Sequence, residues 1–188
     1  MIILIPTQLE AQRFCASNPH ASVVICGVGA AQCAATTAHV IADMRSRGKE
    51  ELLVLAGIAG SYSLEEVALC EVIEVTSEQI AALPARFAES YQVESRTSLR
   101  AVSSNSVNCS SECICNAQIE NMEGAAFMAV CQRLNVDYMQ IRAISNKVGD
   151  PFEMWRVDEA CAALATTLNG LPGLARLGWP GSDSVGRR

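Results

Sequence analysis

Short β-rich apolar runs alternate with helix-like stretches along the chain, and this alternation constrains the fold more than any other feature. The runs typical of strands are Ile2–Pro6, Ser22–Cys26, Leu52–Ala56, Val67–Val75 and Asp137–Ile144. The stretches typical of helices are Ala30–Met44, Asn121–Leu134 and Val157–Leu168. Such alternation favours an α/β sandwich with a mostly parallel or mixed sheet, in which ligands bind at the carboxyl ends of the strands.

The length and composition predict a single globular domain. The chain has 188 residues, and a domain typically has roughly 150. We expect residues 1–169 to form this domain and residues 170–188, which contain several Gly and Pro residues, to form a C-terminal tail. Hydrophobic residues make up 50% of the chain and charged residues 18%, so the chain can build a real core and is not disordered throughout.

The charge balance and the hydropathy pattern exclude further classes of protein. The 14 Lys and Arg residues face 20 Asp and Glu residues, which gives a net charge of −6. This balance argues against nucleic acid and membrane surfaces as partners, because both are anionic and require a basic surface. No apolar run approaches the ~20 residues of a membrane span. The apolar start Met1–Pro6 is too short for a signal peptide and lacks its basic residues, so we expect a cytoplasmic protein.

The nine cysteines fit small buried thiols in a reducing compartment better than disulfides or a metal site. Those on strand-like or helix-like stretches include Cys26, Cys33, Cys131 and Cys161. Cys109, Cys113 and Cys115 lie close together, but a zinc site would need a fourth ligand, and the two histidines, His20 and His39, are distant in sequence. We therefore expect no metal. The scarcity of histidine also removes most Ser-His and Cys-His nucleophile schemes.

Two glycine-containing segments follow strand-like runs. Gly27-Val28-Gly29 precedes a helix-like stretch, where glycines allow a ligand to approach the backbone and a helix N-terminus favours an anion. A dinucleotide-binding site would need a third glycine where Gln32 stands, and an acidic residue after Leu52–Ala56; both are missing. The second segment, residues 57–60, is a weak signal by itself. A tight packing turn remains the alternative for both segments.

Four polar residues stand at positions where chemistry is possible. Glu10 follows the first strand closely and is either a surface residue or a general base. Glu123 begins a small, apolar helix, where it can interact with the helix dipole or with hydroxyl groups in a pocket. Arg142 lies within an apolar strand and needs a carboxylate partner, for which Glu123 is the candidate; a purely structural buried ion pair is the alternative. Asn146 ends that strand and offers both a donor and an acceptor.

Three stretches follow one another along the chain: GIAGS at 57–61, IENMEGAAF at 119–127 and QIRAISN at 140–146. Together with Glu10, the Gly27 turn and Trp155, they resemble the purine nucleoside phosphorylase and nucleosidase superfamily, and most of all the futalosine hydrolases of menaquinone biosynthesis. The resemblance spans most of residues 2–168. It implies a nucleoside phosphorylase-like fold, which is a three-layer α/β/α sandwich with a mixed central sheet. It implies no cofactor, a small-molecule nucleoside as partner, and a homodimer or higher homo-oligomer.

The resemblance also implies a role for each matching residue. Glu10 would activate a water for attack at the anomeric carbon, and Glu123 would accept hydrogen bonds from the ribose hydroxyls. Met122 would pack under the sugar, Arg142 would pair with Glu123 and help to fix the water, and Asn146 would bind the departing base. Further substrate-binding residues are expected at Gly57, Ile58, Asn105 and Val107.

Two residues bear on the substrate. Related adenine-releasing nucleosidases have an aspartate where Asn146 stands, whereas an asparagine amide suits a 6-oxo group such as that of hypoxanthine. Phosphorylases of the superfamily have a phosphate-binding serine where Ile58 stands, so water is the expected nucleophile. The resemblance therefore predicts hydrolysis of futalosine to hypoxanthine and dehypoxanthine futalosine. The alternatives are a methylthioadenosine/adenosylhomocysteine-type nucleosidase, a purine nucleoside phosphorylase and a nucleoside-binding protein without catalytic activity. The segment 77–98 departs from the acidic-glycine pattern of the family.

Overall fold

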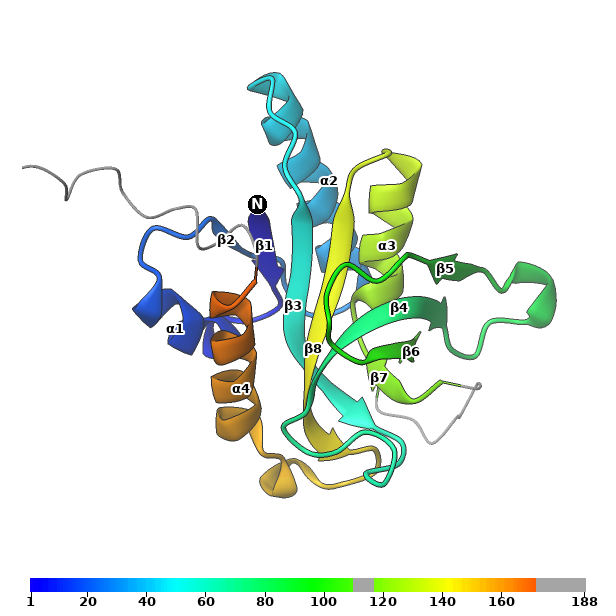
Figure 1. Ribbon diagram of the computed structural model, residues 1–188. Coiled ribbons are helices and arrows are strands. Elements are labelled where there is room, and N and C mark those ends of the chain that lie inside the picture. The colour runs from blue at the N-terminus through cyan, green and yellow to red at the C-terminus, as the bar shows by residue number, and fades with distance from the viewer. Residues whose placement is uncertain (110–116, 172–188) are drawn as a thin grey trace, which may run out of the picture.

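A mixed β-sheet with helices on both faces forms the body of the protein (Figure 1). The structure is a computed structural model that describes residues 1–109 and 117–171. Its strands are β1 (Ile2–Ile5), β2 (Val23–Ile25), β3 (Leu53–Ser61), β4 (Val72–Ile80), β5 (Ser90–Gln92), β6 (Ala101–Ser106), β7 (Ile119–Asn121) and β8 (Tyr138–Lys147). Its α-helices are α1 (Gln8–Ser17), α2 (Ala30–Ser46), α3 (Gly124–Arg133) and α4 (Val157–Asn169). Short 3₁₀ turns lie at Ala85–Phe87 and Phe152–Met154. The predicted three-layer α/β/α fold is confirmed.

The sheet is partly rolled up rather than open. Its strand order is β2-β1-β3-β7-β6-β4-β5, and β8 pairs with both β3 and β4. Strands β3, β8, β4, β6 and β7 therefore form a closed circuit of pairings. The pairs β1–β2, β1–β3, β3–β8, β4–β6 and β6–β7 are parallel, whereas β3–β7, β4–β5 and β4–β8 are antiparallel. The circuit brings the ends of β3, β7 and β8 together.

Alternating residues of the strands divide the hydrophobic core between the two faces of the sheet. On one face, Leu53 and Leu55 pack with residues of α2 and α3, including the fully buried Phe127. On the other face, Val54 packs with residues of α1 and α4, including Phe14. This period of two along β3 is the pattern that a sheet covered on both sides requires. The helices thus hold both faces of the sheet in place beneath the site described below.

Several element boundaries differ from the sequence-based expectation. Residues 57–60 lie within β3 and not in a turn after it, since β3 runs through to Ser61. The helix expected from Asn121 begins at Gly124 and is preceded by the short strand β7. The strand expected at 67–75 occupies residues 72–80. Helix α1 was not expected, because its apolar face is narrow. Its buried residues are Ala11, Phe14 and the carboxylate Glu10.

The predicted buried thiols are found at Cys26, Cys33, Cys131 and Cys161, all of them free. Burial raises the pKa of the Cys131 thiol to about 12 and that of Cys161 to about 11, so both thiols stay protonated and unreactive at neutral pH. Cys109 is exposed, while Cys113 and Cys115 lie outside the described residues, as do residues 172–188 of the expected tail. None of the described helices is long and apolar enough to cross a membrane.

Candidate active site

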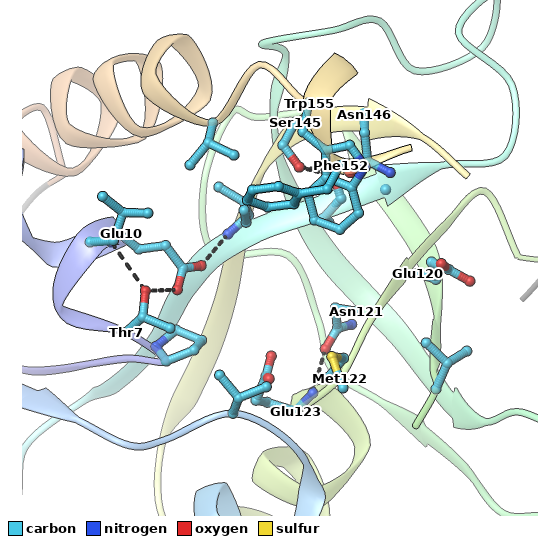
Figure 2. A pocket seen from close by; sticks show the side chains of 18 residues that line it. Thr7, Glu10, Glu120, Asn121, Met122, Glu123, Ser145, Asn146, Phe152 and Trp155 are labelled. Atoms are coloured by element: carbon cyan, nitrogen blue, oxygen red, sulfur yellow. Dashed lines mark hydrogen bonds between the residues drawn. The ribbon is translucent and has the colours of Figure 1, made fainter. Parts of the chain in front are cut away.

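A cavity of about 330 Å³ opens where the carboxyl ends of β1, β3 and β8 meet the start of α1 and the β7–α3 junction. Six of the residues expected at a site line it: Glu10, Ile58, Val107, Met122, Glu123 and Asn146. Three others lie behind its wall. Gly57 lies beneath it in β3, and Arg142 and Asn105 are fully buried. Figure 2 shows Glu10 and Glu123 on one side of the cavity and Asn146 on the other.

The Glu10 carboxylate is held by two donors in the first turn of α1 and in β3. Thr7 caps the helix by accepting the Glu10 backbone N–H at 3.2 Å, and its hydroxyl donates to Glu10 Oε2 at 2.6 Å. The backbone N–H of Ile58 donates to Oε1 at 2.9 Å. The side chain is only 6% exposed. Because each carboxylate oxygen has two acceptor positions, Glu10 is oriented by these contacts and can still accept a hydrogen bond from a ligand or water.

Glu123 and Arg142 form the buried ion pair that the sequence predicts. Arg142 Nη2 lies 3.2 Å from Glu123 Oε2, and the backbone N–H of Gly29 donates to Glu123 Oε1 at 2.9 Å. Gly29 has a positive φ of 87°, which a glycine adopts without strain, and it is the N-cap residue of α2. The glycine turn after β2 therefore binds a carboxylate of the protein itself. The charge of Glu123 is balanced on one side, and the residue faces the cavity on the other.

Gly57 allows Glu10 and Arg142 to approach the same face of β3 closely. A Cβ atom at this position would lie 2.7 Å from Arg142 Nη1 and 2.9 Å from Glu10 Oε1. Arg142 Nη1 also donates to the carbonyl oxygen of Ile58 at 3.3 Å, while the N–H of the same residue binds Glu10. One short piece of β3 thus fixes the general-base candidate and the arginine together.

The Asn146 amide has a fixed orientation. The Ser145 hydroxyl donates to Asn146 Oδ1 at 2.8 Å, and Asn146 Nδ2 donates to the carbonyl oxygen of Lys147 at 3.0 Å. A flipped amide would place its oxygen against this carbonyl oxygen, which is unfavourable. An amide nitrogen has two hydrogens, so Nδ2 has a second one to offer to a ligand. Asn146 thereby presents a donor at the end of the cavity far from Glu10 (Figure 2).

Known proteins resemble this chain in sequence. The sequence model of the Phosphorylase superfamily matches residues 85–174. A futalosine hydrolase from Thermus thermophilus is 45% identical over 56 residues, which are 29% of this chain and 25% of that protein. The matched stretch therefore spans a quarter of the curated relative's length.

Solved structures of nucleosidases and of a futalosine hydrolase share the fold of this chain. A 5'-methylthioadenosine/S-adenosylhomocysteine nucleosidase from Helicobacter pylori superposes with a TM-score of 0.74 at 15% identity, over 89% of this chain and 94% of that one. A futalosine hydrolase from Helicobacter pylori gives 0.74 at 14% identity over 89% and 94%. A 5'-methylthioadenosine nucleosidase from Arabidopsis thaliana gives 0.74 at 17% identity over 89% and 92%. The resemblance to the phosphorylase superfamily is confirmed.

Within this superfamily fold, the described part of the chain places no basic side chain on the cavity wall. The charged residues that line it are three carboxylates, Glu10, Glu120 and Glu123. Phe152 and Trp155, whose rings lie 5.3 Å apart, add an aromatic part of the wall opposite Met122. The described part of this wall offers no cationic side chain to a phosphate, and it is well suited to a flat, apolar ring.

A second layer of polar residues, which the sequence analysis did not identify, lies behind the ion pair. Asn121 Oδ1 accepts from Arg142 Nη2 at 2.9 Å and from the backbone N–H groups of Glu123 and Gly124 at 2.9 and 2.7 Å. Asn121 Nδ2 donates to Glu78 Oε2 at 2.9 Å. Burial raises the pKa of the Glu78 carboxyl to about 7, although the hydrogen bond from Asn121 and the charge of Arg142 lower it. No local pattern marks Glu78, because its neighbours in sequence are polar and its partners are distant.

Proposed function

We propose that the protein is a nucleosidase that hydrolyses the N-ribosidic bond of a 6-oxopurine nucleoside, with futalosine as the preferred substrate. The observation that carries this proposal is that two oriented carboxylates, Glu10 and Glu123, face one cavity from different elements. A third polar group, Asn146, stands at the opposite end. This arrangement provides a base that can activate water, an acceptor for the ribose hydroxyls and a donor for the purine. A nucleoside bound in the cavity would need all three groups.

The proposed reaction assigns a role to each group. Water held by Glu10 attacks the anomeric carbon as the bond to the purine nitrogen breaks and its electron pair moves to the base. Glu10 takes a proton from the water and later releases it to solvent, and the departing base takes up a proton from solvent, so the reaction yields the free sugar, the neutral purine and the regenerated carboxylate. Glu123 accepts hydrogen bonds from ribose hydroxyls, and Met122 packs beneath the ring. Arg142 keeps Glu123 in place, because it donates to that carboxylate and to Asn121.

Hydrolysis is favoured over phosphorolysis by the charges around the cavity. A phosphate nucleophile requires several cationic or polar donors arranged around its oxygens. The described residues that line the cavity provide three carboxylates and an apolar Ile58 instead. Arg142 is fully buried and occupied by Glu123, Asn121 and the carbonyl group of Ile58. A phosphorylase activity would need a phosphate site that these residues do not form.

Two observations support futalosine rather than an adenine nucleoside. Asn146 lines the cavity, and its Nδ2 has one hydrogen beyond the one donated to the Lys147 carbonyl oxygen; such a donor suits the 6-oxo group of a hypoxanthine ring. The relative that is 45% identical over the matched stretch is a futalosine hydrolase. A methylthioadenosine-type nucleosidase is the second candidate, because nucleosidases of that type share the fold.

We also propose a homodimer or higher homo-oligomer. Large apolar side chains are exposed around the mouth of the cavity, with Leu9 55%, Val28 46% and Phe152 67% exposed. Exposed apolar groups that cluster at a ligand site are typical of a surface covered by a partner. Light scattering of the purified protein tests this proposal directly, since a monomer would contradict it.

Product analysis tests the proposed activity. We would incubate the protein with futalosine, inosine, adenosine and methylthioadenosine, with and without phosphate, and separate free base and sugar by chromatography. Hypoxanthine from futalosine without phosphate is the expected result. Adenine release would favour the second candidate, and strict dependence on phosphate would indicate a phosphorylase. Tight binding of a nucleoside without turnover would identify a binding protein instead.

A further inference from the structure

Gly60 lies in β3 between two polar residues that the sheet directs to the same face. Glu120 of β7 is its partner across one edge, and Asn146 of β8 is its partner across the other. Residues paired across neighbouring strands project to the same side of a sheet. Both side chains accordingly line the cavity. A Cβ atom at Gly60 would lie 3.1 Å from Asn146 Nδ2 and 3.2 Å from Val148 Cγ2, so the glycine lets the Asn146 amide lie close over β3, at the end of the cavity where Glu120 also lies.

A directional chain of hydrogen bonds leads to Glu120 from behind. Gln79 Nε2 donates to Asn105 Oδ1 at 2.9 Å, and Asn105 Nδ2 donates to the Tyr62 hydroxyl oxygen at 3.0 Å. The Tyr62 hydroxyl donates in turn to Glu120 Oε2 at 3.0 Å. Because the Tyr62 oxygen accepts from Asn105, its single hydrogen is directed toward Glu120. The chain gives a role to Asn105, which lies behind the cavity and orients a residue that lines it.

The position of Glu120 within the cavity separates it from the hydrolytic groups. Figure 2 shows it on the side of Asn146, away from Glu10. Its side chain is 5% exposed and still lines the cavity. The proposed reaction gives Glu120 no role in water activation or in binding ribose. Its location next to the base end indicates a role in recognition of the purine.

The chemistry of the purine edge suggests what Glu120 recognises. A 6-oxopurine carries a hydrogen on N1, beside the 6-oxo group, and donates it. A 6-aminopurine has a lone pair at N1 and accepts. We propose that Glu120 is a specificity-determining residue that accepts the hydrogen bond from N1–H of a 6-oxopurine, while Asn146 donates to the O6 or N7 side of the same ring. A carboxylate oxygen accepts only, so it repels the N1 lone pair of adenine. This inference rests on the proposed function and adds a second discriminating contact to it.

The test is equilibrium binding of free bases, measured by calorimetry on the full chain. The probes are hypoxanthine, 1-methylhypoxanthine and adenine, which differ in whether N1 donates. We expect wild-type protein to bind hypoxanthine at least tenfold more tightly than either of the other bases. In Glu120→Gln, the Tyr62 hydroxyl holds the new amide oxygen, so the amide NH₂ faces the ring. Hypoxanthine affinity then falls by about 10- to 100-fold, and the preference over adenine falls at least tenfold.

Two further variants guard the interpretation. Glu65→Gln removes an exposed carboxylate and should leave all three affinities unchanged. Tyr62→Phe removes the donor that orients Glu120 while leaving the carboxylate, and should reduce the hypoxanthine preference by a smaller factor. Thermal unfolding of each variant establishes that it is folded. A folded Glu120→Gln protein that keeps its preference within threefold of wild type would overturn the proposal, as would a wild-type protein with no preference for hypoxanthine.

The binding test and the activity test fail independently. If the protein prefers hypoxanthine through Glu120 but hydrolyses no nucleoside, the proposed hydrolysis is wrong and base recognition stands. If it releases hypoxanthine from nucleosides but Glu120→Gln leaves the base preference intact, the proposed hydrolysis stands and the role of Glu120 is wrong.

Discussion

Glu78 provides a prediction whose size follows from its surroundings. The carboxyl is fully buried, and it accepts hydrogen bonds from Ser106, Asn121 and Gln140 at 3.1, 2.9 and 3.1 Å. Desolvation nevertheless dominates and raises its pKa from the ordinary 4.5 to about 7. The folded protein therefore binds a proton at Glu78 more tightly than the unfolded chain does. At 1.36 kcal/mol per pH unit, this difference corresponds to about 3 kcal/mol.

The sign of the effect follows from that raised pKa. The stability that protonated Glu78 contributes is fully present below pH 4.5 and is lost as pH rises through about 7. The amide in Glu78→Gln cannot ionise, so the variant does not lose this stability as pH rises. We expect the free energy of unfolding of the variant, minus that of wild type, to increase by about 3 kcal/mol between pH 4.5 and pH 8. Any constant cost of placing an amide among three donors shifts this curve without changing its slope.

Equilibrium urea unfolding at several pH values measures this difference. All other titrating groups are shared by the two proteins and cancel in the subtraction. Glu94→Gln, which changes an exposed carboxylate, is the matched control and should follow wild type at every pH. Parallel curves for Glu78→Gln and wild type from pH 4.5 to pH 8 would refute the reasoning, because they would mean that Glu78 titrates alike in the folded and unfolded chain.

The other predictions concern catalysis and are measured by steady-state kinetics on futalosine. Glu10→Gln should lower kcat by roughly 10²–10⁴ with little change in KM, and near-normal turnover would exclude Glu10 as the general base. Glu123→Gln should both lower kcat and raise KM, whereas a change in KM alone would limit Glu123 to ground-state binding. Gly57→Ala should reduce kcat at least tenfold and destabilise the fold by about 1–3 kcal/mol, because its Cβ would meet Arg142 and Glu10. A wild-type kcat in Gly57→Ala would show that Arg142 and Glu10 can move aside without loss of activity. Asn146→Asp should lose hypoxanthine release relative to adenine release; unchanged hypoxanthine release with no gain of adenine release would count against the proposed role of Asn146.

The sequence was informative where a single residue is chemically conspicuous in its local setting. A charged residue in an apolar strand needs a partner, and this reasoning led to the Arg142–Glu123 pair that the structure contains. The alternation of strands and helices likewise predicted the layers of the fold. The resemblance to the superfamily added Glu10 to the site, which local pattern alone left as either a base or a surface residue.

The sequence was uninformative where a role depends on contacts between distant segments. Glu78 and Glu120 look like ordinary polar residues of strands, and their burial results from the closed circuit of pairings. Residues 57–60 look like a turn, because glycines are common in turns. Their place within β3 becomes clear only once Arg142 and Glu10 are seen to occupy the space beside Gly57.

The central claim is that the cavity directs water, and not phosphate, to the anomeric carbon of a 6-oxopurine nucleoside. The most direct measurement is mass spectrometry of the sugar product after reaction with futalosine in ¹⁸O-labelled water. We predict release of hypoxanthine without added phosphate and one ¹⁸O atom in the released sugar, with both lost in Glu10→Gln. A phosphorylated sugar product, or no release from futalosine by folded wild-type protein, would contradict the account.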